Sequence, residues 1–203
     1  MEVIELAGVT VTRNHREVIA DFSAALEAGT ITAIVGANGS GKSTLLSAIA
    51  GDLAYAGSIR INGREVRDLS IVEQSQERSV VTQSRHFWLS FSVREILEMG
   101  MSSTEVARCE AVAAELDISS LLNKTVTQLS GGEAQRVEIA RALMVDRPIL
   151  LLDEPLSAQD IQSRRRIEDI LRREKAAGKT IAIVAHLDSA DLSWCDQIIN
   201  LSK

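Results

Sequence analysis

Apolar side chains recur along this chain in distinct patterns, and each pattern predicts a different kind of element. In residues 9–11 and 22–26 they alternate with polar or small residues, which is typical of half-buried β-strands. Residues 31–35, 149–152 and 180–185 are mostly unbroken apolar runs, which are typical of parallel strands covered on both faces. The patterns therefore predict an α/β fold with a β-rich N-terminal part.

Helices are expected between these strands, and two of them have recognisable first turns. Ser92-x-x-Glu95 and Ser102-x-x-Glu105 are capping boxes, which open helices near 93–100 and 103–116. Together they indicate a small helical segment inserted into the α/β chain. Other helices are expected at 45–50, from 130 to about 144, and through Ile167, Ile170 and Leu171 up to Gly178. Further strands are expected at 57–63, 79–83 and 197–201.

The composition limits what kind of protein this is. The 203 residues are 45% hydrophobic, which is enough for the core of one large domain. A net charge of −6 argues against nucleic acid as the main partner. The two cysteines, Cys109 and Cys195, are far apart in the sequence, which fits a reducing compartment. The chain has no membrane-spanning run and no signal segment, so we expect it in the cytoplasm, with any membrane association made through another chain.

The segment from Gly36 to Ser43 has the pattern G-x-x-x-x-G-K-S and stands between an expected strand and an expected helix. Its glycines let backbone N–H groups close around an anion, and the helix N-terminus adds partial positive charge. Lys42 can reach the β- and γ-phosphates, and the Ser43 hydroxyl can bind Mg²⁺. The alternative is a glycine-rich turn with a chance lysine, but every fixed position is filled. The expected nucleotide-binding residues are Gly36, Ala37, Asn38, Gly39, Ser40, Gly41, Lys42, Ser43 and Thr44.

Two adjacent carboxylates, Asp153 and Glu154, follow the apolar run 149–152. In open α/β sheets, ligands bind beyond the carboxyl ends of the strands. Asp153 can hold Mg²⁺ there, and Glu154 can polarise the water that attacks a γ-phosphate. The alternative role is to cap the next turn, but the phosphate-binding pattern earlier in the chain favours catalysis.

The third motif is Leu-Ser-Gly-Gly-Glu-Ala-Gln-Arg at residues 129–136. Ser130 and Glu133 form a good capping box, which alone would explain both residues. The two glycines between them, Gly131 and Gly132, are poor for helix stability. They are explained if backbone N–H groups must approach an anion closely.

With these three motifs, the chain resembles the nucleotide-binding subunits of ABC transporters over essentially its whole length. The resemblance implies a P-loop NTPase core, mainly a parallel sheet with flanking helices, over residues 1–83 and 129–203 of a single 1–203 domain. It also implies an N-terminal antiparallel β subdomain and a helical subdomain over about 84–128. In that family two copies bind ATP with Mg²⁺ head to tail, so that Ser130, Gly131, Gly132 and Glu133 of one copy face the γ-phosphate held by the other.

The same resemblance assigns roles to further residues. Gln83 matches a glutamine that touches Mg²⁺ and senses the transport partner, and His186 matches a histidine that contacts the γ-phosphate. Alone, either one would be an ordinary loop or structural residue. Residues 157–160, which end in Asp160, match the family's D-loop, with Gln159 in place of leucine. The implied catalytic residues are Lys42, Gln83, Glu154 and His186, and the implied Mg²⁺ ligands are Ser43, Gln83 and Asp153.

One position departs from the family pattern. The family usually has an aromatic residue before the second strand, where it stacks on adenine, but residues 9–15 contain no Phe, Tyr or Trp. Arg13 falls near this position and could stack through its guanidinium plane, and His15 is the second choice.

Three of the six aromatic residues, Phe87, Trp88 and Phe91, stand within five positions of one another. One interpretation is the core of a small subdomain. The other is a groove, directly after Gln83, that receives a helix from a separate membrane-embedded permease.

The sequence thus predicts an ATP-hydrolysing subunit that energises a multi-chain transporter from the inner face of the cell membrane. Residues 89–100 are similar to those of importers of metals, metal chelates, haem and vitamin B12. The alternatives are the ATPase of an exporter, a non-transport ATPase of the same family, and a regulatory nucleotide-binding module. Glu154 and His186 argue against a module that does not hydrolyse ATP.

Overall fold

A computed structural model describes residues 2–82, 90–185 and 192–201, and it contains two β-sheets. One sheet is antiparallel, with the strand order β2-β1-β4-β5. The other is parallel, with the order β6-β7-β8-β3-β9. The antiparallel strands are β1 (Glu2–Arg13), β2 (Arg16–Glu27), β4 (Ala56–Ile61) and β5 (Arg64–Glu65), and the parallel strands are β3 (Ile31–Val35), β6 (Arg78–Val81), β7 (Ile149–Asp153), β8 (Thr180–Val184) and β9 (Gln197–Asn200).

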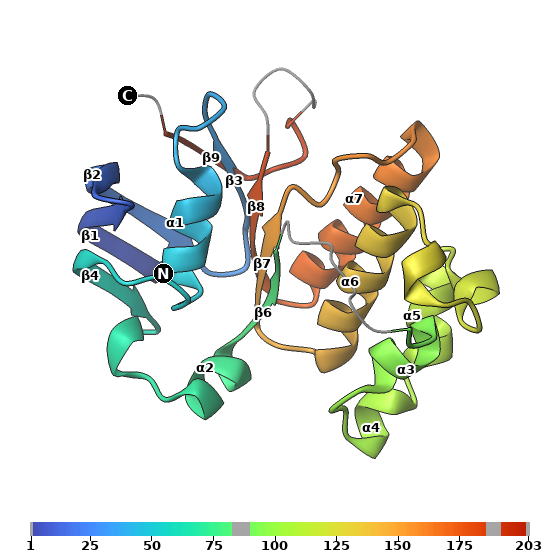
Figure 1. The fold of residues 1–203 in the computed structure, drawn as a ribbon. Coiled ribbons are helices and arrows are strands. Elements are labelled where there is room, and N and C mark those ends of the chain that lie inside the picture. Colours follow the sequence, from blue (N-terminus) through green and yellow to red (C-terminus); the bar gives the residue numbers. More distant parts are fainter. Residues whose placement is uncertain (1, 83–89, 186–191, 202–203) are drawn as a thin grey trace.

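The central strands of the parallel sheet are apolar because both of its faces are covered. All five residues of β3, β7 and β8 are buried. Figure 1 shows α1 (Lys42–Ile49) between the two sheets, and α6 (Gly131–Val145) and α7 (Ile161–Ala176) on the opposite face of the parallel sheet. The predicted α/β fold with an antiparallel N-terminal sheet is therefore confirmed.

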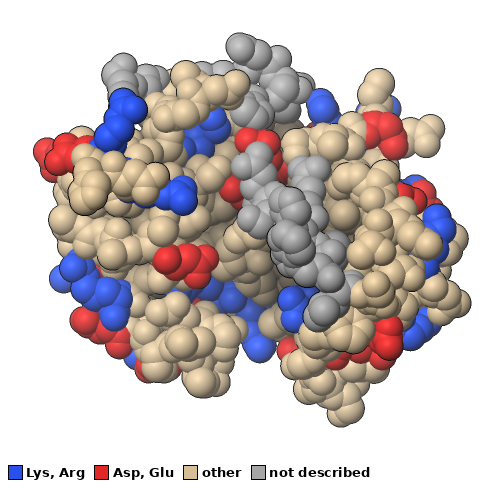
Figure 2. Space-filling model, viewed as in Figure 1, with Lys and Arg blue, Asp and Glu red and all other residues tan. Residues whose placement is uncertain are grey.

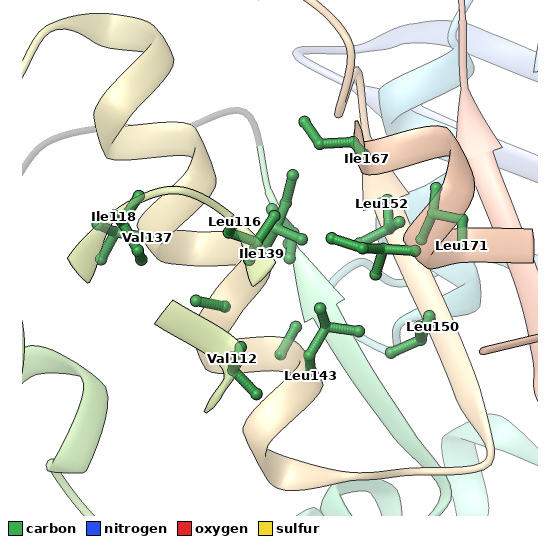
Figure 3. Close-up of a cluster of buried hydrophobic side chains, with 14 of the residues drawn as sticks. Val112, Leu116, Ile118, Val137, Ile139, Leu143, Leu150, Leu152, Ile167 and Leu171 are labelled. Atoms are coloured by element: carbon green, nitrogen blue, oxygen red, sulfur yellow. The ribbon is translucent and has the colours of Figure 1, made fainter. Parts of the chain in front are cut away.

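The hydrophobic core of the parallel sheet continues into the helical part of the chain. Leu150 and Leu152 of β7 belong to the same buried cluster as Leu143 of α6 and as Val112 and Leu116, in or directly after α5 (Cys109–Glu115) (Figure 3). Since one cluster joins both parts, the helical segment is packed onto the core. Its boundaries at about 84 and 128 stay a prediction.

Two helices differ from the sequence expectation. The single helix expected at 103–116 is two helices, α4 (Ser103–Val106) and α5, because the chain turns at Ala107 and Arg108. This turn leaves α4 without a buried residue and points α5 into the core. Helix α2 (Ile71–Glu77) was not expected, although Ser70 and Glu73 form a complete capping box at its start.

The remaining elements are short. The capping box predicted at Ser92 is present and opens α3 (Val93–Glu98). Single 3₁₀ turns occur at Val66–Asp68, Ser119–Leu121 and Val126–Gln128. In the described ranges, no helix is both long and apolar enough to cross a membrane. Figure 2 shows basic and acidic side chains interspersed over one face of the molecule.

Candidate functional site

The loop between β3 and α1 packs tightly against strand β2. Gly41 has a φ of 98°, which favours glycine. A Cβ at Gly41 would lie 2.6 Å from Ile19 Cδ1 and 3.2 Å from the Val18 carbonyl oxygen. Only a residue without a side chain therefore fits between β2 and the first turn of α1. This contact packs the β1–β2 hairpin against the loop of residues 36–43.

Lys42 occupies the centre of this loop. Its side chain is almost fully buried, and Nζ donates hydrogen bonds to the carbonyl oxygens of Gly36 (2.9 Å) and Ala37 (3.1 Å). A buried ammonium whose described hydrogen-bond partners are neutral carbonyl groups still favours a nearby anion. The loop is thus arranged around one positive charge, as phosphate binding requires.

Ser43 and Asp153 meet at the end of β7. Ser43 Oγ donates a 3.0 Å hydrogen bond to Asp153 Oδ1, and Asp153 is almost fully buried. A hydroxyl and a carboxylate oxygen are both hard ligands, which suit Mg²⁺ when a substrate's phosphates complete the coordination. The donor set therefore fits the predicted metal position.

A cavity of about 870 Å³ opens between this loop and the β1–β2 hairpin. That volume is within the range of small-molecule sites. Glu154, directly after β7, stands at one side of the cavity. The lining residues are Arg13, Asn14, Arg16, Glu17, Val18, Asn38, Gly39, Gly41, Lys42, Ser43, Thr44 and Glu154.

Glu154 is held by its backbone in an unusual conformation. Its φ is 51°, which is uncommon for a residue with a side chain. The Glu154 carbonyl oxygen accepts hydrogen bonds from Ser157 N (3.0 Å), from Ser157 Oγ (2.9 Å) and from Gln135 Nε2. These bonds fix the position of the peptide that carries the expected catalytic base.

The segment 130–133 forms the capping box that the sequence allowed. Glu133 N donates to Ser130 Oγ (3.3 Å), and Ser130 N donates to Glu133 Oε2 (2.7 Å), which lowers the pKa of Glu133. A Cβ at Gly132 would lie 2.7 Å from the Ala158 carbonyl oxygen. Gly132 therefore has a reason to be glycine within its own chain. The segment does not line the cavity described above.

Gln159 is a site residue whose role the sequence did not reveal. Its Nε2 donates to the Gly132 carbonyl oxygen (3.1 Å) and to Gln135 Oε1 (3.0 Å), and its Oε1 accepts from Arg136 Nη1 (3.2 Å). Since Gln135 also bonds to the Glu154 carbonyl group, Gln159 completes a chain of contacts from the signature segment (residues 129–136) to Glu154. The one sequence signal was its departure from the usual leucine.

The other expected site residues fall into two groups. Asp160 is the N-cap of α7, where its Oδ1 accepts a 2.8 Å hydrogen bond from Ser163 N, so its described role is structural. Gln83, His186, Phe87 and Trp88 lie outside the described residues.

Comparison with known proteins decides the family. A family model described as ABC transporter matches residues 19–157, well over half of the chain. The chain belongs to the ABC transporter family. As the resemblance implied, it is an ATP-binding subunit with ATPase activity.

Curated relatives of this ABC ATPase include two named hemin import ATP-binding protein HmuV. The protein from Rhizobium etli is 37% identical over 97% of this chain and 80% of its own length. The protein from Bordetella avium is 33% identical over 98% of this chain and 83% of its own length. A solved structure described as an ATP-binding subunit of an ABC transporter superposes with a TM-score of 0.87 at 23% identity, and it covers 98% of this chain and 85% of that one. This last likeness supports the fold alone.

Proposed function

We propose that this ABC ATPase energises the import of haem, or of a related metal chelate, through a permease made of separate chains. The observation that carries the proposal is the identity of up to 37%, over nearly the whole chain, with proteins named as hemin import ATP-binding proteins. Free metal ions and cobalamin are the alternative cargoes of the same importer type.

Different residues of the cavity bind the phosphates of ATP, hold its metal ion and activate the attacking water. The loop from Gly36 to Thr44 binds the phosphates, and Lys42 neutralises part of their charge. Ser43 and Asp153 would hold Mg²⁺, which would supply positive charge that offsets the negative charge of the phosphates. Glu154 accepts a proton from the attacking water at the end of β7. Gln83 and His186 complete the site by resemblance, Gln83 as a further metal ligand and His186 at the γ-phosphate.

A second copy of the chain supplies the rest of the site. Ser130, Gly131, Gly132 and Glu133 lie away from the cavity of their own chain, which supports a role toward ATP bound by a partner copy. Asp160, at the start of α7, would lie at the same interface. ATP would then close the two copies together, and hydrolysis would release them.

A groove between the core and the helical segment is a suitable place for the permease. It has a volume of about 360 Å³, is lined by residues of α2, β6, α4 and α6, and includes the exposed side chain of Met99, directly after α3. Strand β6, which contributes Arg78, Ser79 and Val80 to the groove, ends two positions before Gln83 in the sequence. Phe91, which is close to Gln83 in the sequence, is partly buried. Its carbonyl oxygen accepts a hydrogen bond from Val126 N, which ties it to the helical segment. This location would attach the subunit to the inner face of the membrane.

Growth on defined iron sources tests the cargo. A strain that lacks this chain should fail to grow with haem as the sole iron source and should still grow on ferrous salt. The wild-type chain should restore growth, and Glu154→Gln should not. Normal growth of the deletion strain on haem, with a defect in uptake of vitamin B12 or of a ferric chelate, would move the assignment to that cargo.

A further inference from the structure

Glu138 is a partly buried carboxylate of α6 that takes no part in the nucleotide site. It lines the groove of about 360 Å³ between the core and the helical segment. Among the described residues, it has no hydrogen bond and no ion pair within 4.0 Å. Burial raises the pKa of Glu138, and attraction to Arg141 offsets only part of this effect. A charge in this position is unfavourable in the free chain, because it loses water and gains no donor.

Ser79 of β6 is a second group at this groove without a partner. The residue is only 7% exposed, and in the part of the chain that the structure describes no group forms a hydrogen bond with its Oγ. Side chains alternate along a strand, so Ser79 shares a face of the sheet with Val81. Val81 packs in the same buried cluster as Val137 and Ala140 of α6, which places Ser79 on the α6 side. Two unsatisfied oxygen groups, one from β6 and one from α6, therefore line one groove.

Two of the arginines that line the groove are directed elsewhere. Arg78 belongs to the opposite face of the sheet, where its Nε donates a 3.1 Å hydrogen bond to the Ala50 carbonyl oxygen at the end of α1. Arg141 is exposed, and its Nη2 donates a 3.3 Å hydrogen bond to the Met99 carbonyl oxygen. Neither guanidinium therefore satisfies Glu138.

The third arginine of the groove, Arg147, is compensated within the chain. Its Nε donates a 2.7 Å hydrogen bond to the Ser75 carbonyl oxygen, and its Nη2 lies 3.7 Å from Glu105 Oε1. Glu105 also lines the groove, so the charges of Arg147 and Glu105 balance there. Glu138 is thus the carboxylate of the groove with which no described basic group pairs.

The rest of the groove wall suits a long side chain with an apolar stem. It includes Met99, Met101, Ala142 and Val145. Lysine and arginine bury their methylene groups along apolar surface and keep the charged head in a polar environment. An acidic side chain would instead be repelled by Glu138, and a purely apolar one would leave both oxygen groups unsatisfied. The groove is therefore complementary to a basic side chain.

We propose that Glu138 and Ser79 recognise a lysine or arginine that the permease inserts into this groove from the segment that docks there. The proposal rests on the permease site of the proposed function and adds the chemistry of the residue that binds. The basic head group donates to the Glu138 carboxylate and to the Ser79 hydroxyl, since both an ammonium and a guanidinium carry several donors. Such a contact selects the partner, because a segment with an acidic residue at this place is rejected.

NMR titration of the isotopically labelled free chain with n-butylammonium chloride tests the site without the permease. The probe should shift backbone amide signals around Ser79 and Glu138, whereas sodium butyrate and butanol at the same concentrations should not. Glu138→Gln should abolish these shifts. Glu27→Gln, which removes an exposed glutamate outside the groove, is the matched control and should keep them. Glu138→Gln should unfold at the same urea concentration as the wild type or at a higher one, since an unpaired charge is removed.

The affinity of the chain for permease subunits of the same organism, purified in detergent, measures the contact in the complex. Glu138→Gln should weaken assembly by about 10- to 100-fold, the range of a lost charge-assisted hydrogen bond, and Ser79→Ala by about 2- to 10-fold. Glu27→Gln should assemble as the wild type does. Glu138→Lys should prevent assembly, and glutamate in place of one lysine or arginine in the cytoplasmic loops of the permease should restore it.

Three results would overturn the proposal: butylammonium shifts that are absent from the wild type or unchanged in Glu138→Gln, wild-type assembly of both Glu138 variants, or a Glu138→Lys variant that no charge reversal in the permease rescues. Failure of the permease site has a different signature. Met99→Arg places a bulky charged side chain at an exposed position of the groove and should block docking. If Met99→Arg also assembles normally, the permease docks elsewhere. If it prevents assembly whereas Glu138→Lys permits it, the groove is the docking site and the recognition of a basic residue is wrong.

Discussion

Replacing Gln159 by leucine should measurably destabilise this ABC ATPase, even though leucine is the residue that its family usually carries there. The substitution preserves the size of the side chain and removes its amide. Three hydrogen bonds are lost, to Gly132, Gln135 and Arg136. Gln159 is partly buried, so leucine also gains some apolar contact.

The expected magnitude follows from these contacts. A hydrogen bond contributes about 1 kcal/mol net, and a partly buried apolar side chain returns about 1 kcal/mol. Arg136 keeps a second partner, the Ser163 hydroxyl at 3.3 Å, which limits the loss. We therefore expect Gln159→Leu to lower the free energy of unfolding by about 2 kcal/mol, which corresponds to a fall in Tm of roughly 4–8 °C for a chain of this size.

Urea unfolding followed by circular dichroism measures this loss, and Gln162→Leu is the matched control. Gln162 is an exposed glutamine three positions further along, in the first turn of α7. Its substitution should cost less than 0.5 kcal/mol, the usual limit for surface changes. ATP turnover should also fall in Gln159→Leu, with ATP affinity nearly unchanged, because Gln135 then positions the Glu154 peptide less firmly. If both variants unfold at the same urea concentration as the wild type, the contacts of Gln159 contribute nothing and the reasoning is wrong.

Lys42→Ala should weaken ATP binding by about 10- to 100-fold, since a charge-assisted contact is lost, and calorimetry that shows unchanged affinity would contradict the site. Glu154→Gln should retain ATP, lose turnover by about 100-fold or more, and form an ATP-dependent dimer that Ser130→Arg prevents; a monomer at saturating ATP in light scattering counts against the two-copy arrangement. Gly132→Ala should cost about 1–3 kcal/mol in urea unfolding, because its Cβ would lie 2.7 Å from the Ala158 carbonyl oxygen; wild-type stability would mean that the 158 peptide moves aside. Burial works to raise the pKa of Glu65, but hydrogen bonds from Ser58, Arg67, Ile59 N and Tyr55 outweigh it and lower that pKa to about 2. The stability that these bonds provide is present above pH 4.5 and is lost as the pH falls toward 2, so unfolding measured at pH 5 and pH 3 should show a smaller loss in Glu65→Gln than in the wild type.

Much of this protein could be predicted from sequence because the deciding interactions are local. The loop from Gly36 to Ser43 is specified by neighbouring residues, and so are the capping boxes at Ser92 and Ser130. The buried strand β7 is likewise evident from four consecutive apolar residues. For such features, the backbone conformation follows from residues within one or two turns, so chemistry and structure can be inferred together.

Contacts between distant segments could not be predicted in this way. Gln135 and Gln159 are 24 positions apart and meet only because α6 and the loop after β7 pack on the same edge of the sheet. The close approach of Gly132 to Ala158 depends on the same packing, and sequence reasoning, which considered only a role toward a phosphate for this glycine, did not predict it. The pairing of Arg13 with Arg16 depends on strand register, which turn geometry and side-chain packing set together. Local patterns therefore determined which groups this chain carries, whereas tertiary packing decided which of them act on one another.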